Sequence, residues 1–108
     1  MKLEYSKGIL FIRFINNIDH SISYKINSLL IPKILNEKIK YIALNMYEVN
    51  DIDEFGLDAL LNMKCAIRTN NGKICLCEVS DKLKRKLRNI RIKKVDNELN
   101  VLNMIGAI

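Results

Sequence analysis

The 108-residue sequence lacks the residue sets that most catalytic and metal sites require. It contains one histidine, no phosphate-binding glycine loop, no Ser-His-Asp set and no spaced metal ligands. We therefore expect a protein without catalytic activity, cofactor or bound metal. His20 and its neighbour Asp19 could form an acid–base pair, but a histidine in a turn is more often a surface or capping residue.

Long apolar runs and a cysteine framework are also missing. No stretch reaches the ~18 uncharged apolar residues of a membrane span, and the first residues lack the layout of a signal peptide. The three cysteines are an odd number, which argues against a disulfide framework. Cys75 and Cys77 are two residues apart, so we expect both on one strand face as small buried hydrophobes. These absences predict a cytoplasmic protein with no membrane contact.

The net charge of +6 is very unevenly distributed. Residues 82–94 carry eight basic side chains, whereas residues 48–58 carry five carboxylates and no basic residue. Direct nucleic-acid binding by the basic helix is one interpretation, because lysine and arginine neutralise phosphates. No recognition motif and no interleaved aromatic residues accompany the basic run, which favours a solvated helix face or a patch for an acidic partner.

With 49% hydrophobic and 28% charged residues, the chain fits a single domain over residues 1–108. Apolar strand-like runs alternate with amphipathic helical patterns, which predicts an α/β fold with a mostly parallel sheet. The expected strands span residues 2–6, 9–15, 41–46, 74–79 and 90–95. The expected helices span residues 22–34, 55–68, 81–89 and 97–105.

Helix boundaries and faces follow from caps and spacing. Asp19 or Ser21 is expected to cap the first helix, whose apolar face would contain Ile22, Ile26, Leu29, Leu30 and Ile34. Pro32 predicts a kink or break near residues 28–32. Ser80 is expected to cap the basic helix. In the last helix, Leu99, Leu102, Met104 and Ile105 are expected to dock on the sheet before Gly106 ends it.

The acidic segment 48–58 joins an apolar strand to an apolar helix. Asp53 can cap this helix and Glu54 can lie in its first turn, where unpaired N–H groups and the helix dipole favour negative charge. The helix face would contain Gly56, Ala59, Leu60, Met63 and Ile67, widened by Leu57 and Leu61. We expect this junction to be the functional part of the molecule.

Two short motifs in this order of elements resemble the STAS domain, and within it the single-domain anti-sigma factor antagonists of bacteria. Asn17-Ile18-Asp19-His20 is similar to the family's Gly-Glu-Leu-Asp-His-like turn, with Asn16 where glycine is usual. Residues 52–57, Ile-Asp-Glu-Phe-Gly-Leu, are similar to the family pattern apolar-Asp-Ser-Ser/Ala-Gly-Leu. The resemblance implies a STAS-like α/β fold: a mixed sheet of four to five strands, with about four helices packed largely on one face.

The resemblance also implies a mode of regulation. In the family, a partner that is both serine kinase and anti-sigma factor phosphorylates the serine after the aspartate, and the modified antagonist releases that partner. Glu54 occupies this position here. It could be a fixed phosphoserine mimic, although it carries one charge where phosphoserine carries about −1.5 to −2. The other interpretation is a plain helix-start residue that contributes about 0.3 to 1 kcal/mol through the helix dipole.

The implied partner is a protein, either a serine-kinase anti-sigma factor or a related ATPase, and the chain would be a monomer or weak homodimer. Phe55 is either an exposed anchor for that partner or a side chain folded back over the sheet. Gly56 fits a close approach of helix and strand, or of a partner backbone. The residues implied to bind the partner are Asp19, His20, Asp53, Phe55, Gly56 and Leu57.

Two other interpretations remain open at this point. The same fold can serve as an accessory STAS subunit of a lipid-transport ATPase complex. It can also serve as a module that senses a nucleotide or another small molecule.

Overall fold

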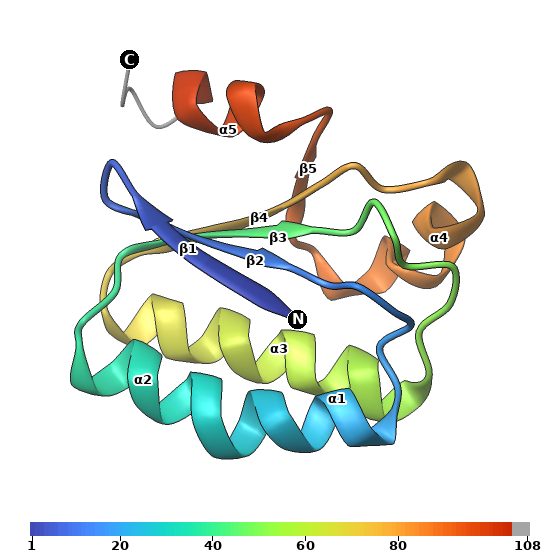
Figure 1. Ribbon diagram of the computed structural model, residues 1–108, viewed down its shortest axis with the longest axis horizontal. Helices are drawn as coiled ribbons and strands as arrows, with labels where there is room; N and C mark the ends of the chain where they lie inside the picture. The colour runs from blue at the N-terminus through green and yellow to red at the C-terminus, as the bar shows by residue number, and fades with distance from the viewer. Residues whose placement is uncertain (105–108) are drawn as a thin grey trace.

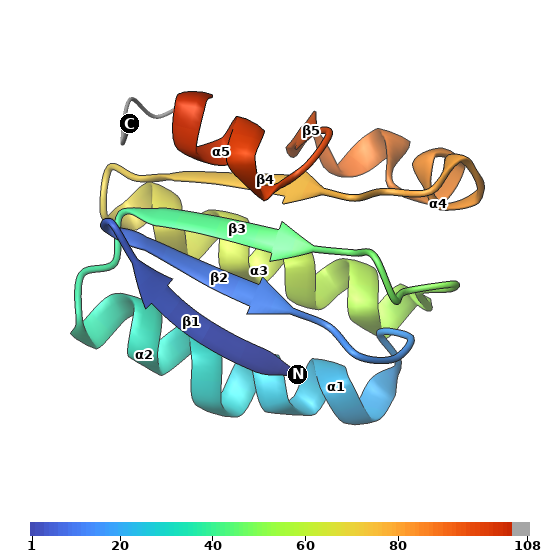
Figure 2. The same ribbon diagram turned by 45° about the horizontal axis from the view of Figure 1, so that its top comes forward.

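A computed structural model describes residues 1–104 and contains a five-stranded mixed sheet. The strands lie side by side in sequence order, with β1 antiparallel to β2 and with β2 to β5 all parallel. The carboxyl ends of the four parallel strands therefore meet at one end of the sheet (Figure 2). The strands are β1 (Lys2–Ser6), β2 (Ile9–Arg13), β3 (Tyr41–Asn45), β4 (Lys73–Cys77) and β5 (Lys93–Val95).

Four helical stretches accompany the sheet within residues 1–104. They are α1 (His20–Lys25) continued by η1 (Ile26–Leu30) and α2 (Ile31–Asn36), then α3 (Glu54–Thr69), α4 (Asp81–Lys86) with the short η2 (Arg88–Ile90), and α5 (Glu98–Met104). Helices α1, α2 and α3 cover one face, whereas α5 crosses the opposite face (Figure 1). The predicted α/β class, mixed sheet and largely one-sided helix layer are confirmed.

Side chains on the strands alternate between the two faces of the sheet. On β3, Ile42 and Leu44 belong to the core under α1 to α3, while Ala43 belongs to the smaller core under α5. Cys75 and Cys77 of β4 share the α5 face, because residues two apart on a strand point the same way. Both thiols are free and buried, as expected.

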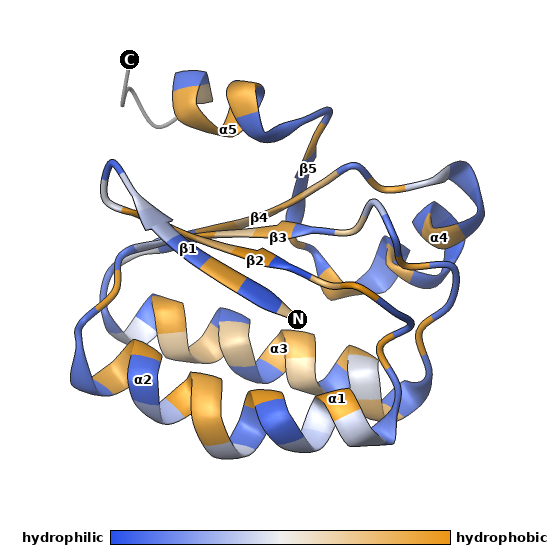
Figure 3. Cartoon of the chain, viewed as in Figure 1, coloured by the Kyte–Doolittle hydropathy of each residue, from blue (hydrophilic) through white to orange (hydrophobic). Residues whose placement is uncertain are grey.

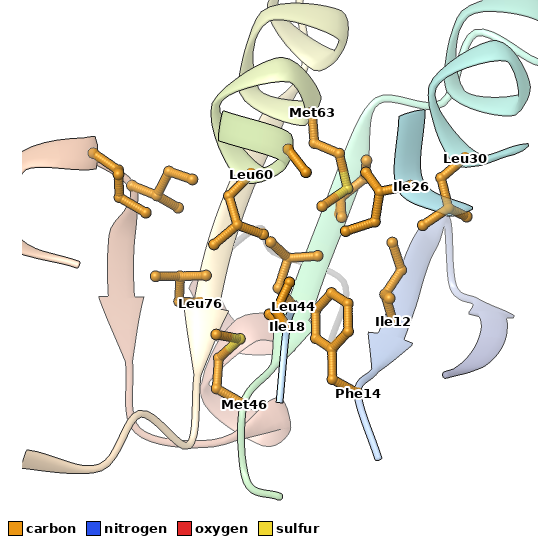
Figure 4. Close-up of a cluster of buried hydrophobic side chains, with 14 of the residues drawn as sticks. Ile12, Phe14, Ile18, Ile26, Leu30, Leu44, Met46, Leu60, Met63 and Leu76 are labelled. Carbon is orange, nitrogen blue, oxygen red and sulfur yellow. The ribbon is translucent and has the colours of Figure 1, made fainter. Parts of the chain in front are cut away.

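The larger core lies between the sheet and α1 to α3 and is almost entirely aliphatic. Figure 4 shows Leu60 and Met63 of α3 facing Leu44 of β3, with Ile26 and Leu30 approaching from the neighbouring helix. Figure 3 shows apolar and hydrophilic residues alternating along these helices. The main α3 face expected from spacing is confirmed, since Gly56, Ala59, Leu60, Met63 and Ile67 are all buried. Leu61, expected to widen this face, is instead exposed.

The sequence predicts a kink or break near residues 28–32; the chain remains helical through Pro32, so there is no break, but the helix is irregular at this place. Segment η1 is instead a π-helical turn, in which the Ile31 N–H donates to the Ile26 carbonyl five residues earlier. Pro32 follows directly after this turn and is in the first turn of α2. The wider turn delays the return to the buried face, and Leu29, expected in the core, is 65% exposed.

The basic segment folds differently from the expected helix and long strand. Helix α4 is capped by the Ser80 hydroxyl, as predicted, but Ile90 lies in η2 and Arg91 adopts a left-handed conformation with φ of 54°. The Lys64 ammonium group on α3 donates to the carbonyls of Ile90 and Arg91, at 3.2 and 2.9 Å. Strand β5 therefore begins only at Lys93 and is short.

Helix α5 docks on the sheet, although not through all the residues expected. Val101 is buried there and Leu102 and Met104 are partly buried, whereas Leu99 is 58% exposed. Ile105 and Gly106, for which a docking role and a helix end were predicted, lie outside the described residues.

Candidate functional site

Two loops at the carboxyl end of the sheet are joined along their backbones. Ile18 and Ile52 form a parallel bridge: the Ile18 N–H donates to the Asp51 carbonyl and the Asp53 N–H to the Ile18 carbonyl, both at 3.2 Å. The Asn17 side-chain oxygen accepts from the N–H groups of Asn50 and Asp51, both at 2.9 Å. The structure thus brings together the two motifs, which are more than thirty residues apart in the sequence.

Gly56 makes the close approach of α3 to this junction possible. A Cβ atom at position 56 would lie 2.4 Å from the Ile18 carbonyl oxygen, 2.7 Å from Cγ1 of Ile52 and 2.9 Å from Cγ2 of Ile18. Any larger residue would have to displace backbone as well as side chains. Of the two roles considered for Gly56, the close intramolecular approach is observed.

The starts of α1 and α3 are both capped by aspartate. Asp19 Oδ1 accepts from the Ile22 N–H at 3.0 Å, and Asp53 Oδ1 accepts from the Gly56 N–H at 2.8 Å. Each carboxylate satisfies one N–H that the helix itself leaves unpaired and lies at the positive end of the helix dipole. Both expected caps are therefore present, and both aspartates are exposed.

His20 and Phe55 connect the two helix starts through their side chains. Their ring centroids are 4.9 Å apart, with an interplanar angle of 74°, which is an edge-to-face contact. Phe55 is 49% exposed and is absent from both buried clusters, so it does not fold back over the sheet. The two aromatic side chains thus bridge the starts of α1 and α3 and remain accessible to solvent.

Glu54 is the first residue of α3 and is exposed. Because Asp53 fills the cap position, the Glu54 carboxylate is not needed there. Within residues 1–104, the side-chain hydrogen bonds and ion pairs include none from Glu54. Leu57 is only half-buried and packs against the larger core. Glu54 is thus the member of the motif whose charge is most available to another molecule.

The basic helix α4 packs beside the acidic junction. The Lys86 ammonium group is hydrogen-bonded to Asp51 and donates to the Ile52 carbonyl at 3.2 Å, and Lys84 pairs with Asp81 at 3.3 Å. The bond from Lys86 is the main cause that holds the pKa of Asp51 below its ordinary value, with a smaller effect from a backbone hydrogen bond. Two cations of this helix therefore have acidic neighbours within the chain.

A polar cluster at the same end of the sheet was missed by the sequence analysis. The Arg13 guanidinium group at the end of β2 binds Glu98 of α5 through Nε and Nη2, at 2.8 and 2.6 Å, and Glu4 of β1 through Nη1 at 2.7 Å. Asn45 at the end of β3 adds a 2.7 Å hydrogen bond to Glu98. Arg13 chiefly, helped by Asn45 against the opposing effect of burial, lowers the pKa of Glu98. The available signal was Arg13 itself, the only charge in an otherwise apolar strand.

Metal chemistry finds no support in the described part of the chain. Among residues 1–104, no three His, Cys, Asp or Glu side chains lie together as metal ligands would. Burial raises the pKa of the Cys75 thiol to about 11 and that of Cys77 to about 12. Both cysteines are therefore protonated packing residues near neutral pH.

The fold and this end of the sheet together define a class: a small α/β domain in which two adjoining capped helix starts present acidic and aromatic side chains. A family model described as "STAS domain" matches residues 1–102. The chain belongs to the STAS domain family, which confirms the resemblance carried by the two motifs. None of the helices among residues 1–104 is long and apolar enough to cross a membrane.

The chain is similar to antagonists of anti-sigma factors in sequence and in structure. It is 23% identical over 112 residues to an anti-sigma F factor antagonist of Paenibacillus polymyxa, covering 100% of this chain and 96% of the relative. A proposed anti-sigma factor antagonist from Thermotoga maritima superposes with a TM-score of 0.89 at 16% identity, covering 97% of this chain and 93% of the other. The Bacillus antagonist SpoIIAA in its unphosphorylated form gives 0.82 at 19% identity, with coverage of 99% and 98%. These likenesses show that the chain has the same fold as these antagonists.

Proposed function

We propose that this protein is a non-catalytic regulator that binds a serine-kinase anti-sigma factor, or a related ATPase, at the junction of α1 and α3. A relative in sequence is an anti-sigma F factor antagonist, and SpoIIAA has the same fold. The backbone bridge between Ile18 and Ile52 holds the two helix starts in one fixed surface. A rigid surface loses little entropy when it binds, which favours a docking role.

Within this surface, the proposed contacts come from the exposed side chains Asp19, His20, Asp53 and Phe55. Phe55 is the anchor, because a half-exposed aromatic side chain supplies large contact area at low entropic cost. Gly56 is buried and Leu57 half-buried, so these two position the helix start more than they touch a partner.

The observation that carries the regulatory part of the proposal is the exposed, unpaired carboxylate of Glu54 beside a helix start that Asp53 already caps. A charge in this place adds little to the fold but lies where it can alter binding. We propose that Glu54 acts as a fixed, partial mimic of phosphoserine and weakens binding to a serine-kinase partner. A carboxylate would give only a labile acyl phosphate, so ordinary reversible phosphorylation is not expected at residue 54.

Calorimetric titration of a serine-kinase anti-sigma factor from the same organism tests the Glu54 proposal. Glu54→Ser is expected to tighten binding by about 2 kcal/mol, because it removes a charge from the docking surface and leaves a hydroxyl group. The serine variant should also take up phosphate from the kinase and ATP. Its free energy of unfolding should change by less than ~1 kcal/mol, since serine is tolerated in a first helical turn.

The matched control is Asp58→Ser, which removes an exposed carboxylate one turn further along α3. It should change neither affinity nor phosphate uptake. Equal affinities of wild type and Glu54→Ser, with no phosphate incorporated, would show that Glu54 is only a helix-start residue.

Phe55→Ala tests the location of the docking surface independently of whether Glu54 mimics phosphoserine. In the Glu54→Ser background, loss of the aromatic anchor should weaken binding by about 2 kcal/mol. If the affinity stays the same, the α1–α3 junction is not the docking surface, whatever Glu54 does.

A further inference from the structure

A second candidate site lies at the opposite end of the sheet, where β4 and β5 begin. It is a cleft of about 500 Å³ between the last turns of α3, the first residues of β4 and β5, and α5. We call it the basic cleft; it is lined by Lys64, Ile67, Arg68, Gly72, Lys73, Ile74, Arg91, Ile92, Lys93 and Met104. Since α3 rises about 1.5 Å per residue, Glu54 and Arg68 are roughly 20 Å apart along the helix axis.

The lining of the basic cleft combines two chemistries. Ile67 and Ile92 are buried, and Ile74 and Met104 are partly buried, so the floor is apolar. Within the described part of the chain, the rim contributes five basic side chains and no carboxylate. A polar head on an apolar body is the kind of molecule that such a lining fits.

Four of the five cations have no assigned partner among residues 1–104. The Lys64 amine is occupied by the carbonyls of Ile90 and Arg91. Arg68, Lys73, Arg91 and Lys93 take part in none of the ion pairs or side-chain hydrogen bonds found among residues 1–104. Like charges grouped around one hollow repel each other, and a bound anion would remove that cost.

The dipole of α3 explains only some of the cations that line the basic cleft. Arg68 lies in the last turn of α3, where a cation offsets the negative end of the helix dipole. The dipole explains neither Lys73 and Lys93, which begin two strands, nor Arg91. The left-handed φ of Arg91 is an uncommon conformation for a residue other than glycine, and the Lys64 bond to its carbonyl holds it.

We propose that the basic cleft binds a small organic phosphate, with the phosphate at Arg91, Lys93 and Lys73 and an apolar body on the isoleucine floor. Arginine forms paired hydrogen bonds with phosphate oxygens, and lysine adds charge without a fixed geometry. This site is independent of the docking surface and of Glu54.

Hexyl phosphate and inorganic phosphate are the probes that test the proposal. In a two-dimensional amide NMR titration at low salt, hexyl phosphate should shift signals of residues 67–74 and 91–93. It should bind at least about tenfold more tightly than inorganic phosphate, because the hexyl chain buries apolar surface. Equal affinities of the two probes would overturn the proposed apolar contact.

The variant pair is chosen to keep the charge change equal. Arg91→Gln combined with Lys93→Gln removes two exposed cations from the cleft, and Arg85→Gln combined with Lys82→Gln removes two exposed cations from α4. The first pair should weaken hexyl phosphate binding about tenfold and the second by less than twofold. Equal weakening by both pairs would mean that binding depends only on the net charge of the protein, and it would refute the site.

The same variants distinguish a soluble ligand from a lipid headgroup. Binding of free hexyl phosphate that is lost in the cleft variant supports a soluble organic phosphate. Co-sedimentation with phosphatidic acid vesicles alone, lost in the same variant, supports the same phosphate chemistry on a lipid. If the wild-type protein binds neither probe, the proposal fails.

Discussion

The two ends of the parallel sheet hold charge in different ways. At the carboxyl end, Arg13 pairs with Glu98, and Lys86 pairs with Asp51, so cations and carboxylates from distant segments neutralise each other. At the amino end, the cations of the basic cleft face one another, and none of them pairs with a carboxylate within residues 1–104. Among the described residues, the comparison separates paired charge that holds the fold together from unpaired charge that is available to other molecules, which is Glu54 alone in its motif at the carboxyl end and most of the cations in the basic cleft.

This difference changes the interpretation of the sequence's most basic segment. Residues 82–94 form one run in the sequence, but the fold divides it between the two ends. Lys86 on α4 binds the acidic junction, whereas Arg91 and Lys93 line the basic cleft. Local net charge therefore identifies neither the positive surface nor its function.

Each end of the sheet has a glycine at or next to α3 where the chain packs closely. The largest effects on the free energy of unfolding are expected at these two glycines. A Cβ atom at Gly72 would lie 2.2 Å from the Lys40 carbonyl oxygen and 2.8 Å from the Lys40 C and Cα atoms, which are all backbone atoms. At Gly56, two of the three closest atoms belong to side chains that can shift. We expect Gly72→Ala to lower the free energy of unfolding by about 3 kcal/mol and Gly56→Ala by about 2 kcal/mol.

Urea denaturation monitored by circular dichroism measures both losses. Asp58→Ala on the exposed side of α3 should stay within about 0.5 kcal/mol of wild type and is the control for alanine itself. The reverse order, with Gly56→Ala the more costly, would mean that the carboxyl end is the more rigid of the two.

Glu98→Gln tests the paired charge at the carboxyl end. Because the folded-state pKa of Glu98 is lowered, its contribution to stability is present above its unfolded-state pKa and is lost as pH falls through the folded-state pKa. At pH 7 the variant should be less stable by about 1 to 2 kcal/mol, since the pair is only partly buried.

Below about pH 4.5 the difference between wild type and Glu98→Gln should shrink, as the wild-type carboxylate becomes protonated. Urea unfolding at a series of pH values measures this. Glu37→Gln, which breaks the exposed Lys33–Glu37 pair on α2, is the matched control and should cost only about 0.3 kcal/mol. Equal costs of the two substitutions would remove the distinction between the Arg13 cluster and an ordinary surface pair.

The smallest effect is expected at the Asp51–Lys86 pair. Lys86→Gln should raise the pKa of the Asp51 carboxyl group toward its ordinary value, because the hydrogen bond from Lys86 is the main cause of its lowering. Carboxyl-detected NMR titration measures this directly. Lys82→Gln should shift the same pKa much less, since Lys82 acts only through its charge and is the weakest of the causes. An unchanged pKa in Lys86→Gln would show that α4 does not neutralise the acidic junction in solution.

The sequence by itself determined the places of β1 to β4, the capped helix starts and the family. Asp19, Asp53 and Ser80 each cap a helix by accepting an N–H three residues later, and such short-range bonds can be recognised from residue type and spacing. The alternation of apolar residues predicted the α/β class, and the two motifs predicted the STAS fold. These features depend on neighbouring residues, so no tertiary contact was needed to infer them.

Only the tertiary structure decided which distant residues pair, which side chains are exposed and where the basic cleft forms. Arg13 and Glu98 are 85 residues apart, and Lys86 and Asp51 are 35 apart, so no local pattern links them. The π-helical turn before Pro32, which exposes Leu29, replaces the break that proline predicts in an isolated helix. The basic cleft likewise draws its cations from α3, β4, β5 and Arg91, which follows η2. Whether a charge is paired, buried or available depends on which segments pack beside it, and that is settled only when the chain folds.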